Sequence, residues 1–443
     1  MDTAPQGATP RDQDPHVTPA RYITGDIPGI GGHIKERAED FLVDELPLYQ
    51  PMGEGEHIYM LIEKRGMSTF DMLREVAKHF GVSRSAVSYA GLKDKHAITR
   101  QVVSVHVPGK RPEDFPMLQH DRIAVMWTDL HTNKLRPGHL AGNRFSIRIR
   151  GVAPTSVVSA KRVLDTLERE GVPNRFGEQR FGHLENNHLI GRAIVLMEHE
   201  QALDLLLGPN AAHPEAQPES RIAYHHGDYD TALDFMPPYL RTEIYALRRL
   251  RKRGSPSKII NGLDHTTARY YLSALQSAVF NAVLDARVVD GTWNRVVAGD
   301  LAMLENRAVF AVDEATAGEP DTIERNRKHE IGPSGPMFGP KMTDAAGAVR
   351  DLEYRALDRL GMSAADFSAY DAKHSGMVSG SRRPLRVSLG SPDIEGGMDE
   401  HGPFVRVAFD LPRGSFATTV LREIIKPPAD RPSLTASADL DDD

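Results

Sequence analysis

Sequence typical of β-strands lies at both ends of this chain and encloses a long helical middle. Segments 41–46, 57–63 and 103–107 combine β-branched or aromatic residues with turn-rich neighbours, and apolar residues alternate again over 405–409. Between them, residues 269–288 carry an apolar stripe at helical spacing. This order predicts an α+β fold in which one mixed-sheet domain is interrupted by an inserted, largely helical domain.

The acidic charge of the chain is concentrated at its ends. The 443 residues carry a net charge of -7, of which residues 1–20 contribute -2 and residues 427–443 contribute -4. Both ends are rich in Pro, Ala, Ser and Asp, so we expect disordered tails at 1–24 and 427–443. The remaining body is nearly neutral, which leaves room for a basic face that binds nucleic acid.

The composition excludes several classes of protein and of site. The chain has no cysteine, which excludes disulfides, thiolate metal sites and cysteine nucleophiles. Its apolar runs are shorter than the roughly 20 residues that span a bilayer. The N-terminus lacks the basic and then apolar pattern of a secretory signal. We therefore expect a cytoplasmic protein with no membrane partner.

One acidic residue, Asp94, lies between Lys93 and Lys95 in the stretch YAGLKDKHAITRQ (89–101). A helix predicted over 69–80 precedes this stretch, with a second short helix after Ser83, and a strand follows it. Asp94 is therefore expected on a helix-to-strand connection, where side chains are presented rather than packed. A solvated turn and a functional carboxylate both remain possible interpretations.

The run KLRPGHLAGNRFSIRIR (134–150) predicts a strand with two different faces. Asn143, Phe145, Ile147 and Ile149 share one face, and the arginines at 144, 148 and 150 share the other with Ser146. The cationic face is either the solvated side of a sheet or a surface for phosphates. The Asn and Phe of the apolar face are suited to holding and stacking a base.

Three further segments combine basic residues with aromatic residues or helix ends. VPNRFGEQRFGHLENN (172–187) interleaves Arg and Phe, which suits unstacked RNA but also occurs in packing corners. RRLRKRG (248–254) is the densest basic run and is either a solvated helix end or a phosphate contact. A helix expected to begin at or near Ser415 has Arg413 beside its N-terminus, where a phosphate could bind.

Other motifs do not support a cofactor or metal site. The glycine-rich run at 332–342 lacks the Gly-Lys-Ser/Thr ending of a P-loop, and PGIGGHI (28–34) lacks the third glycine of a dinucleotide fingerprint. The histidines and aspartates of YHHGDYD (224–230) match no metal-ligand spacing, which favours a polar loop. We expect no metal and no cofactor.

Six motifs in order resemble the TruD family of tRNA pseudouridine synthases, and the resemblance spans about residues 30–426. They are IKERAEDFLVDELP, GLKDKHAITRQ, KLRPGHLAGNRF, VPNRFGEQRFG, YLSALQSAVFN and LPRGSFATTVLREI. The resemblance implies the pseudouridine synthase fold, with a mixed, mostly antiparallel sheet flanked by helices. It also implies a catalytic domain at 25–170 and 372–426, interrupted by a TRUD insertion domain at 171–371.

The resemblance further implies an isomerase that converts a uridine of tRNA to pseudouridine, at position 13 in the bacterial members, on a flipped-out base. Asp94 would be the catalytic residue, Lys35 its basic partner, Phe145 the residue that stacks on the base and Asn143 a hydrogen-bonding neighbour. The residues we predict to contact RNA are Lys93, Lys95, His96, Arg144, Arg175, Phe176, Gln179, Arg180 and Arg413. We expect the protein to act as a monomer.

Two alternatives come from other functional classes. The chain could bind and fold tRNA without modifying it, with Asp94 as a structural charge. It could instead hydrolyse the glycosidic bond with Asp94 and a second carboxylate such as Glu39 or Asp40, which would release free uracil. One departure from the family pattern is segment 198–267, which we judge longer than in compact bacterial members.

Overall fold

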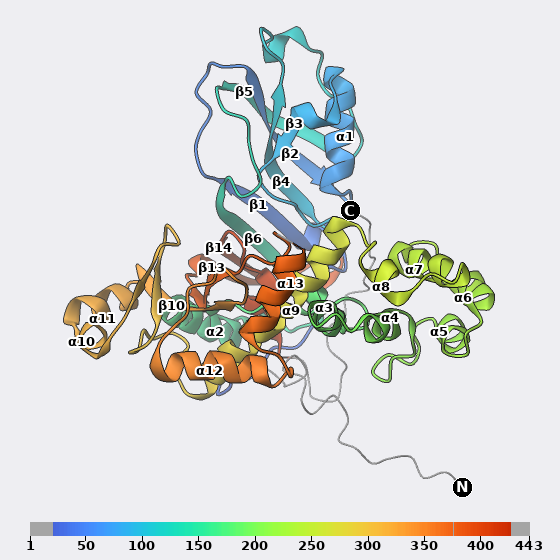
Figure 1. Cartoon of the computed structure of the whole chain (residues 1–443). Helices are drawn as coiled ribbons and strands as arrows, with labels where there is room; N and C mark the ends of the chain where they lie inside the picture. The colour runs from blue at the N-terminus through green and yellow to red at the C-terminus, as the bar shows by residue number, and fades with distance from the viewer. Residues whose placement is uncertain (1–20, 375, 427–443) are drawn as a thin grey trace. The chain divides into compact units, whose positions relative to one another are not determined.

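The computed structural model describes residues 21–374 and 376–426, so the expected tails at 1–20 and 427–443 lie outside the described residues. The chain forms two compact units (Figure 1). We call residues 24–172 and 387–426 the sheet unit, and residues 173–386 the middle unit. The chain passes between the units at the short strands β7 (Val172–Pro173) and β12 (Arg386–Val387).

The sheet unit is built on an eight-stranded sheet with the order β13-β14-β6-β1-β4-β2-β5, and β3 pairs with β4 off this path. Its strands are β1 (Phe41–Pro47), β2 (His57–Arg65), β3 (Val87–Tyr89), β4 (Ile98–His106), β5 (Ile123–His131), β6 (Leu140–Arg150), β13 (Gly390–Asp399) and β14 (Gly402–Pro412). Only the β1–β4 pair is parallel among the strand pairs described here. The predicted mixed, mostly antiparallel sheet is therefore confirmed.

Strands from the two ends of the chain meet in this sheet. In the antiparallel β6–β14 pair, Phe145 lies opposite Phe409 and Ile147 lies opposite Val407. All four side chains are buried. Burying these apolar faces against one another supplies the free energy that holds the two chain ends together. The predicted apolar face of residues 143–149 is confirmed.

Three helices and four short 3-10 turns complete the sheet unit. They are α1 (Thr69–Phe80), α2 (Val157–Glu170), α14 (Ala417–Ile425), η2 (Ala38–Asp40), η3 (Arg84–Ala86), η4 (Pro112–Asp114) and η5 (Pro154–Ser156). Helix α1 begins after Ser68, whose side chain accepts a hydrogen bond from the Asp71 amide at 3.1 Å, and ends at Gly81 in the left-handed region. These are the ends predicted from the sequence. Helix α14 begins at Ala417 with Phe416 as its N-cap residue, next to the expected Ser415, and no side-chain cap is found among the described residues.

The arginine at the end of β6 is buried rather than presented to solvent. The Arg150 guanidinium donates to both oxygens of Asp40 at 2.6 and 2.8 Å and to both oxygens of Asp399 at 2.8 and 2.9 Å. Asp40 comes from η2 and Asp399 from β13, so one side chain ties three segments together. The interpretation of Arg150 as part of a phosphate-facing surface is wrong, because its donors are already used inside the protein.

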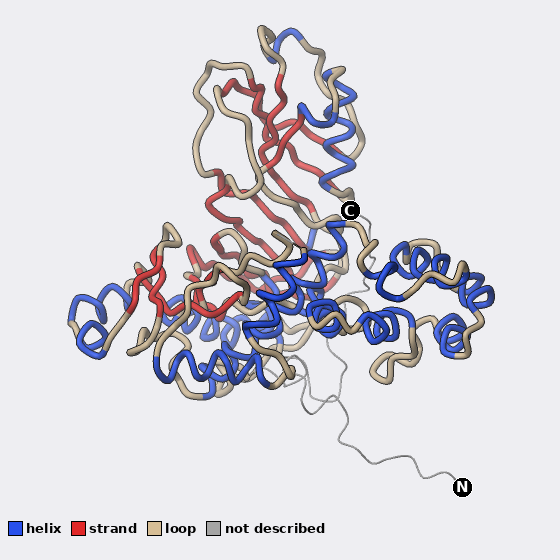
Figure 2. The backbone as a smooth tube through the Cα atoms, in the orientation of Figure 1, coloured by secondary structure: helices blue, strands red, loops and turns tan. Residues whose placement is uncertain are grey.

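The middle unit is mostly helical (Figure 2), with a four-stranded sheet in the order β11-β10-β8-β9. Its helices are α3 (Asn187–Val195), α4 (His199–Leu207), α5 (Pro218–His225), α6 (Tyr229–Phe235), α7 (Arg241–Arg251), α8 (Pro256–Ile260), α9 (His265–Val289), α10 (Glu314–Gly318), α11 (Pro320–Arg327), α12 (Gly347–Asp358), α13 (Ala364–Lys373) and the turn η6 (Glu178–Phe181). Its strands are β8 (Leu301–Leu304), β9 (Val309–Ala311), β10 (Ile331–Met337) and β11 (Ser381–Pro384). Strand β11 pairs with β10, which keeps the chain up to residue 386 in this unit rather than up to the expected 371.

Helix α9 is the central helix of the middle unit. By length and composition it could cross a membrane, but 67% of its most apolar window is buried inside the protein, as for a core helix. Helix α3 packs directly on it at Gly191, where an added Cβ would lie 2.2 Å from the Tyr271 carbonyl oxygen. The predicted apolar stripe of this segment is therefore core.

We predict that Arg150→Met destabilises the sheet unit by about 3–5 kcal/mol, because it leaves two carboxylates without their buried cation. The measurement is urea unfolding at neutral pH, followed by the fluorescence of Trp127 in β5. A Trp293→Phe background removes the signal of the middle unit.

The matched control is Arg148→Met on the same strand. Arg148 is 3.6 Å from Asp399 and its side chain is 35% exposed, so its loss should cost about 1 kcal/mol or less. Equal losses of stability in the two variants would contradict a special role for the buried guanidinium.

Candidate active site

Asp94 lies on the loop that connects β3 to β4. The expected loop position is confirmed, but the element before the loop is the short strand β3 and not a helix. Its side chain is half-buried, with 29% of its surface exposed. One carboxylate oxygen contacts the Lys35 ammonium, and the other accepts a hydrogen bond from the His96 amide at 2.9 Å. Both oxygens are therefore held in place while part of the carboxylate remains accessible.

The surroundings of Asp94 favour its ionised form. Burial by itself raises the pKa of this carboxyl group. The charge and hydrogen bond of Lys35, together with the His96 amide, outweigh burial, so the pKa of Asp94 is lower than that of a solvated aspartate. The site therefore presents a carboxylate at neutral pH.

Lys35 links Asp94 to an aromatic cluster. Its backbone adopts a left-handed conformation with φ of 60°, which is uncommon for a residue with a side chain. Its ammonium lies 4.8 Å from the centre of the Phe41 ring, and that ring is in an edge contact with Phe145 at 6.5 Å between ring centres. The structure thus brings Asp94 and Lys35 together, with Phe145 reached through Phe41.

Phe145 and Asn143 come from the same strand, β6. Phe145 is 8% exposed and packs between Phe41 and Phe409, whose ring centre is 5.7 Å away. The side-chain oxygen of Asn143 is buried and accepts no hydrogen bond from the described residues. Beside it, Gly142 lets β14 approach closely, since an added Cβ would lie 2.2 Å from the Leu411 carbonyl oxygen. An unsatisfied buried acceptor such as the Asn143 oxygen is costly, and a ligand or a water molecule could supply its missing hydrogen bond.

The prediction that Lys93 contacts RNA phosphates is wrong. The Lys93 side chain is 3% exposed, and its ammonium donates to Glu45 on β1 at 2.6 Å. The second oxygen of Glu45 accepts from the Val102 amide on β4 at 3.2 Å. Because the charge of Lys93 is neutralised inside the fold, it anchors the loop rather than reaching a ligand. Lys95 is half-buried and His96 is exposed.

A second buried lysine, Lys64 on β2, supports the same loop and was missed in the sequence. Its ammonium is fully buried and donates to the Met67 carbonyl at 2.6 Å, the Asp94 carbonyl at 2.8 Å and the Lys93 carbonyl at 3.4 Å. The position of Lys64 in the alternation of β2 could have revealed it from the sequence. Lys64 continues the inward-facing series of Ile58, Met60 and Ile62, where a lysine needs an internal partner.

Of the predicted RNA contacts of the middle unit, Phe176 and Arg175 are engaged inside the protein, whereas Gln179 and Arg180 keep accessible surface. Phe176 is wrong as a stacking surface, because its ring is 6% exposed and packs against Phe280 and the Arg383 guanidinium, 4.1 Å from the ring centre. Arg175 forms an ion pair with Asp285. Gln179 is exposed, and Arg180 is half-buried.

In the sheet unit, Arg144 pairs with Asp410 at 2.8 Å, although 36% of its side chain is exposed. Arg413 is exposed and donates to the Gly138 carbonyl at 2.5 Å. In the metal candidate at 224–230, Asp228 caps α6 by accepting from the Thr231 amide at 3.1 Å. No group of His, Asp and Glu within the described ranges is arranged to hold a metal ion.

The carboxylates considered for hydrolysis are both engaged elsewhere. Asp40 is fully buried in its contact with Arg150, and Glu39 pairs with Arg65. Among the described residues, neither side chain forms an ion pair with Lys35 or a hydrogen bond with Asp94. The geometry therefore gives no support to a pair of carboxylates acting across a glycosidic bond.

We predict that Lys64 makes stability depend on pH above neutrality. Burial lowers the pKa of Lys64 to about 8, and Asp94, Lys93 and Asp71 modulate it. Between about pH 8 and the ordinary lysine value of 10.5 the unfolded chain binds a proton that the folded chain lacks, so this contribution to stability rises with pH. The difference in the free energy of unfolding between wild type and Lys64→Met should therefore increase by up to about 3 kcal/mol across this window.

The measurement is the free energy of unfolding by urea at several pH values from neutral to alkaline. Lys78→Met on α1 is the control, because Lys78 is exposed and its removal should leave a flat difference from wild type. Parallel pH curves for wild type and Lys64→Met would show that Lys64 keeps an ordinary pKa.

The comparisons with known proteins agree with one another. A family model described as tRNA pseudouridine synthase D (TruD) matches residues 18–424. The tRNA pseudouridine synthase D of Geobacter sulfurreducens is 42% identical over 412 residues, which cover 92% of this chain and 97% of that protein. The tRNA pseudouridine synthase D of Syntrophotalea carbinolica is 40% identical, with 92% and 99% of the two chains covered.

A solved structure extends the agreement to the fold. A protein of Methanosarcina mazei, assigned as a tRNA pseudouridine synthase D, matches with a TM-score of 0.78 at 28% identity, covering 94% of this chain and 98% of that one. The predicted fold class and the predicted family are therefore both confirmed, and the non-catalytic alternative is set aside. The chain belongs to the TruD family of tRNA pseudouridine synthases and is an isomerase.

Proposed function

We propose that this enzyme converts a uridine of tRNA, at position 13, to pseudouridine, with Asp94 as the catalytic carboxylate. The observation that carries the proposal is the state of Asp94. It is half-exposed, ionised at neutral pH and held at both oxygens by Lys35 and the His96 amide. A carboxylate acts as a nucleophile or a base only in this ionised form.

The reaction rearranges bonds within one nucleotide. The bond from uracil N1 to ribose C1′ breaks, the base turns, and a bond from C5 to C1′ forms. C5 loses its proton and N1 gains one, so the reaction has no net redox change and consumes no second substrate. Asp94 acts at the ribose or on the C5 proton. The adjacent Lys35 ammonium stabilises negative charge on the carboxylate between these steps.

We assign recognition of the base to Asn143 and Phe145 of β6. The Asn143 oxygen, which lacks a partner among the described residues, is suited to accept the N3–H of uracil. The base must first leave the helical stack of the tRNA, which costs a few kcal/mol. Only 8% of the Phe145 side chain is exposed, so its contact with the base offsets less than the roughly 1–3 kcal/mol that full stacking on an aromatic ring contributes per base.

The remaining partners follow from the substrate. tRNA is a polyanion, and we assign phosphate contacts to Lys95, His96, Arg144, Arg180 and Arg413, with Gln179 as a neutral donor. Arg144 pairs with Asp410, but 36% of its side chain remains exposed. Arg175 is a weaker candidate, because it pairs with Asp285 and only 14% of its side chain is exposed. We infer a monomer that works in the cytoplasm and uses no cofactor.

We predict that Asp94→Asn abolishes pseudouridine formation, with a loss of about 1,000-fold or more, while tRNA binding is retained. Purified protein is incubated with unmodified tRNA transcripts. Pseudouridine is then located by carbodiimide labelling and primer-extension stops, which also tests position 13. Asp165→Asn is the control, because Asp165 is an exposed aspartate of α2 that pairs with Lys161 on the same helix. Full activity in Asp94→Asn would remove this carboxylate from the chemistry.

We predict that Lys35→Met shifts the acidic limb of the pH–rate profile to higher pH. Lys35 lowers the pKa of Asp94, so its removal raises that pKa and the carboxylate is lost at a higher pH than in wild type. The measurement is kcat/KM between about pH 4 and 7. Lys78→Met, on the surface of α1, should retain the wild-type limb. An unshifted limb in Lys35→Met would show that Asp94 is not the group titrated.

A further inference from the structure

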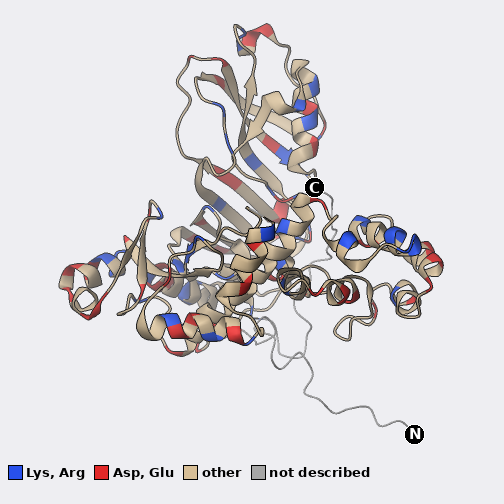
Figure 3. Cartoon of the chain, in the orientation of Figure 1, with Lys and Arg blue, Asp and Glu red and all other residues tan. Residues whose placement is uncertain are grey.

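The most cationic helix of the middle unit lies far along the chain from the residues assigned to the reaction. Helix α7 and the turn after it carry six cations within residues 241–253 (Figure 3). These are Arg241, Arg248, Arg249, Arg251, Lys252 and Arg253. All six are exposed. The single acid of the helix, Glu243, is buried and faces Arg221 on α5, so it does not neutralise the exposed face.

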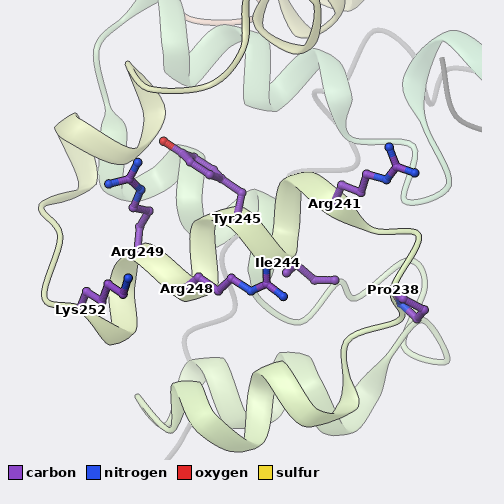
Figure 4. A pocket seen from close by; sticks show the side chains of 7 residues that line it. All are labelled: Pro238, Arg241, Ile244, Tyr245, Arg248, Arg249 and Lys252. Carbon is purple, nitrogen blue, oxygen red and sulfur yellow. The ribbon is translucent and has the colours of Figure 1, made fainter.

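Four of these cations line a groove of about 620 Å³ (Figure 4). Arg241, Arg248, Arg249 and Lys252 fall on one side of the helix, because their spacing brings successive turns into register. Ile244 and Tyr245 lie between them and form the apolar wall. From the first cation to the last, the row extends along the helix axis for roughly 16 Å.

Among the described residues, three of the four groove cations lack the acidic partners that surface arginines of this unit have elsewhere. Within the described residues, Arg251 is paired with Asp230 at 3.1 Å, but no ion pair is found for Arg248, Arg249 or Lys252. Lys252 is three and four residues from the other two, a spacing at which like charges repel. This repulsion destabilises the folded protein, and a bound polyanion would relieve it.

Helix α11 shows the opposite arrangement with the same kinds of residue. Arg327 pairs with Glu324 at 2.7 Å, and Lys328 pairs with the same carboxylate at 3.4 Å. Arg325 lies 3.8 Å from Asp321 and 3.7 Å from Glu330. The uncompensated charge of α7 is therefore a local feature and not a property of every basic helix in the unit.

The geometry of the groove suits a nucleic-acid backbone. The Arg249 guanidinium lies 5.4 Å from the centre of the Tyr245 ring, and this cation–π contact holds the group at the wall of the groove. An extended row of cations matches a succession of phosphates, whereas a single small anion needs donors that converge on one point.

We propose that this α7 groove is a docking surface for the phosphate backbone of the tRNA substrate, through Arg241, Arg248, Arg249 and Lys252. The proposal rests on the proposed function only for the identity of the RNA. Its contacts are to phosphates and carry no base specificity, so the groove contributes affinity and not the choice of uridine.

The test compares two triple variants that remove the same charge. The groove variant, Arg248→Ala/Arg249→Ala/Lys252→Ala, removes three of the four cations that line the groove. The α11 variant, Arg325→Ala/Arg327→Ala/Lys328→Ala, removes three cations that already have acidic partners. The Kd for an unmodified tRNA transcript is measured by filter binding over a series of salt concentrations. The rate of pseudouridine formation is measured separately, in a single turnover with enzyme in saturating excess.

The groove variant should bind tRNA about tenfold or more weakly at about 0.1 M salt, and the slope of log Kd against log salt should fall by about 2. Its single-turnover rate at saturation should equal that of wild type. The α11 variant should keep the wild-type Kd and slope. Arg248→Lys/Arg249→Lys, which keeps the charge, should restore most of the slope and so excludes a folding defect.

A groove variant with the Kd and slope of wild type would overturn the proposal and would leave an acidic protein as the occupant to consider. Equal weakening by the two triple variants would also overturn it, because the effect would then be one of net charge. The binding experiment does not depend on catalysis. If wild type bound tRNA but formed no pseudouridine, the proposed function would fail while the groove could still be confirmed.

Discussion

The carboxylate of Asp94 depends on cations that the fold buries around it. A half-buried carboxyl group alone would bind a proton more readily, and Lys35 reverses this by direct contact. Behind the loop, Lys64 donates to backbone carbonyls that include that of Asp94, and Lys93 is anchored to Glu45. One lysine therefore sets the charge of the carboxylate, while two others hold the backbone that carries it. Strands β1 and β2 supply Glu45 and Lys64, the loop between β3 and β4 supplies Lys93 and Asp94, and Lys35 comes from the segment before η2.

Pairing with an acidic residue distinguishes the structural cations of this protein from those that we propose to bind RNA. Arg150, Lys93 and Arg175 each have an acidic partner within their own unit, and each is largely buried. In contrast, Arg248, Arg249 and Lys252 of α7 are exposed and have no ion pair among the described residues. A cation that the protein has neutralised has little left to offer to a phosphate. For the RNA contacts proposed here, the presence or absence of an acidic partner is therefore the criterion, rather than the density of basic residues along the chain.

Much of the architecture follows from local pattern. The ends of α1 follow from Ser68 and Gly81, and the two faces of β6 follow from simple alternation. The strand blocks at both ends of the chain predict a shared sheet, since neither block can bury its apolar face alone. The boundary at 371 was misplaced because β11 pairs with β10, and a pairing between distant segments leaves no local signal. Phe176 was misplaced for the same reason, since Phe280 and Arg383 cover it from over 100 residues away.

The sequence by itself determined the fold class, the family and the loop position of Asp94, because alternation, capping and ordered motifs are properties of neighbouring residues. Only the tertiary structure decided how each charge is used. It put Lys93 on Glu45, 48 residues away, and Arg150 on Asp40 and Asp399. It also revealed Lys64 beneath the Asp94 loop. Whether a charged side chain meets an acid, a carbonyl or solvent depends on partners brought close by chain folding, and a linear sequence does not contain those distances.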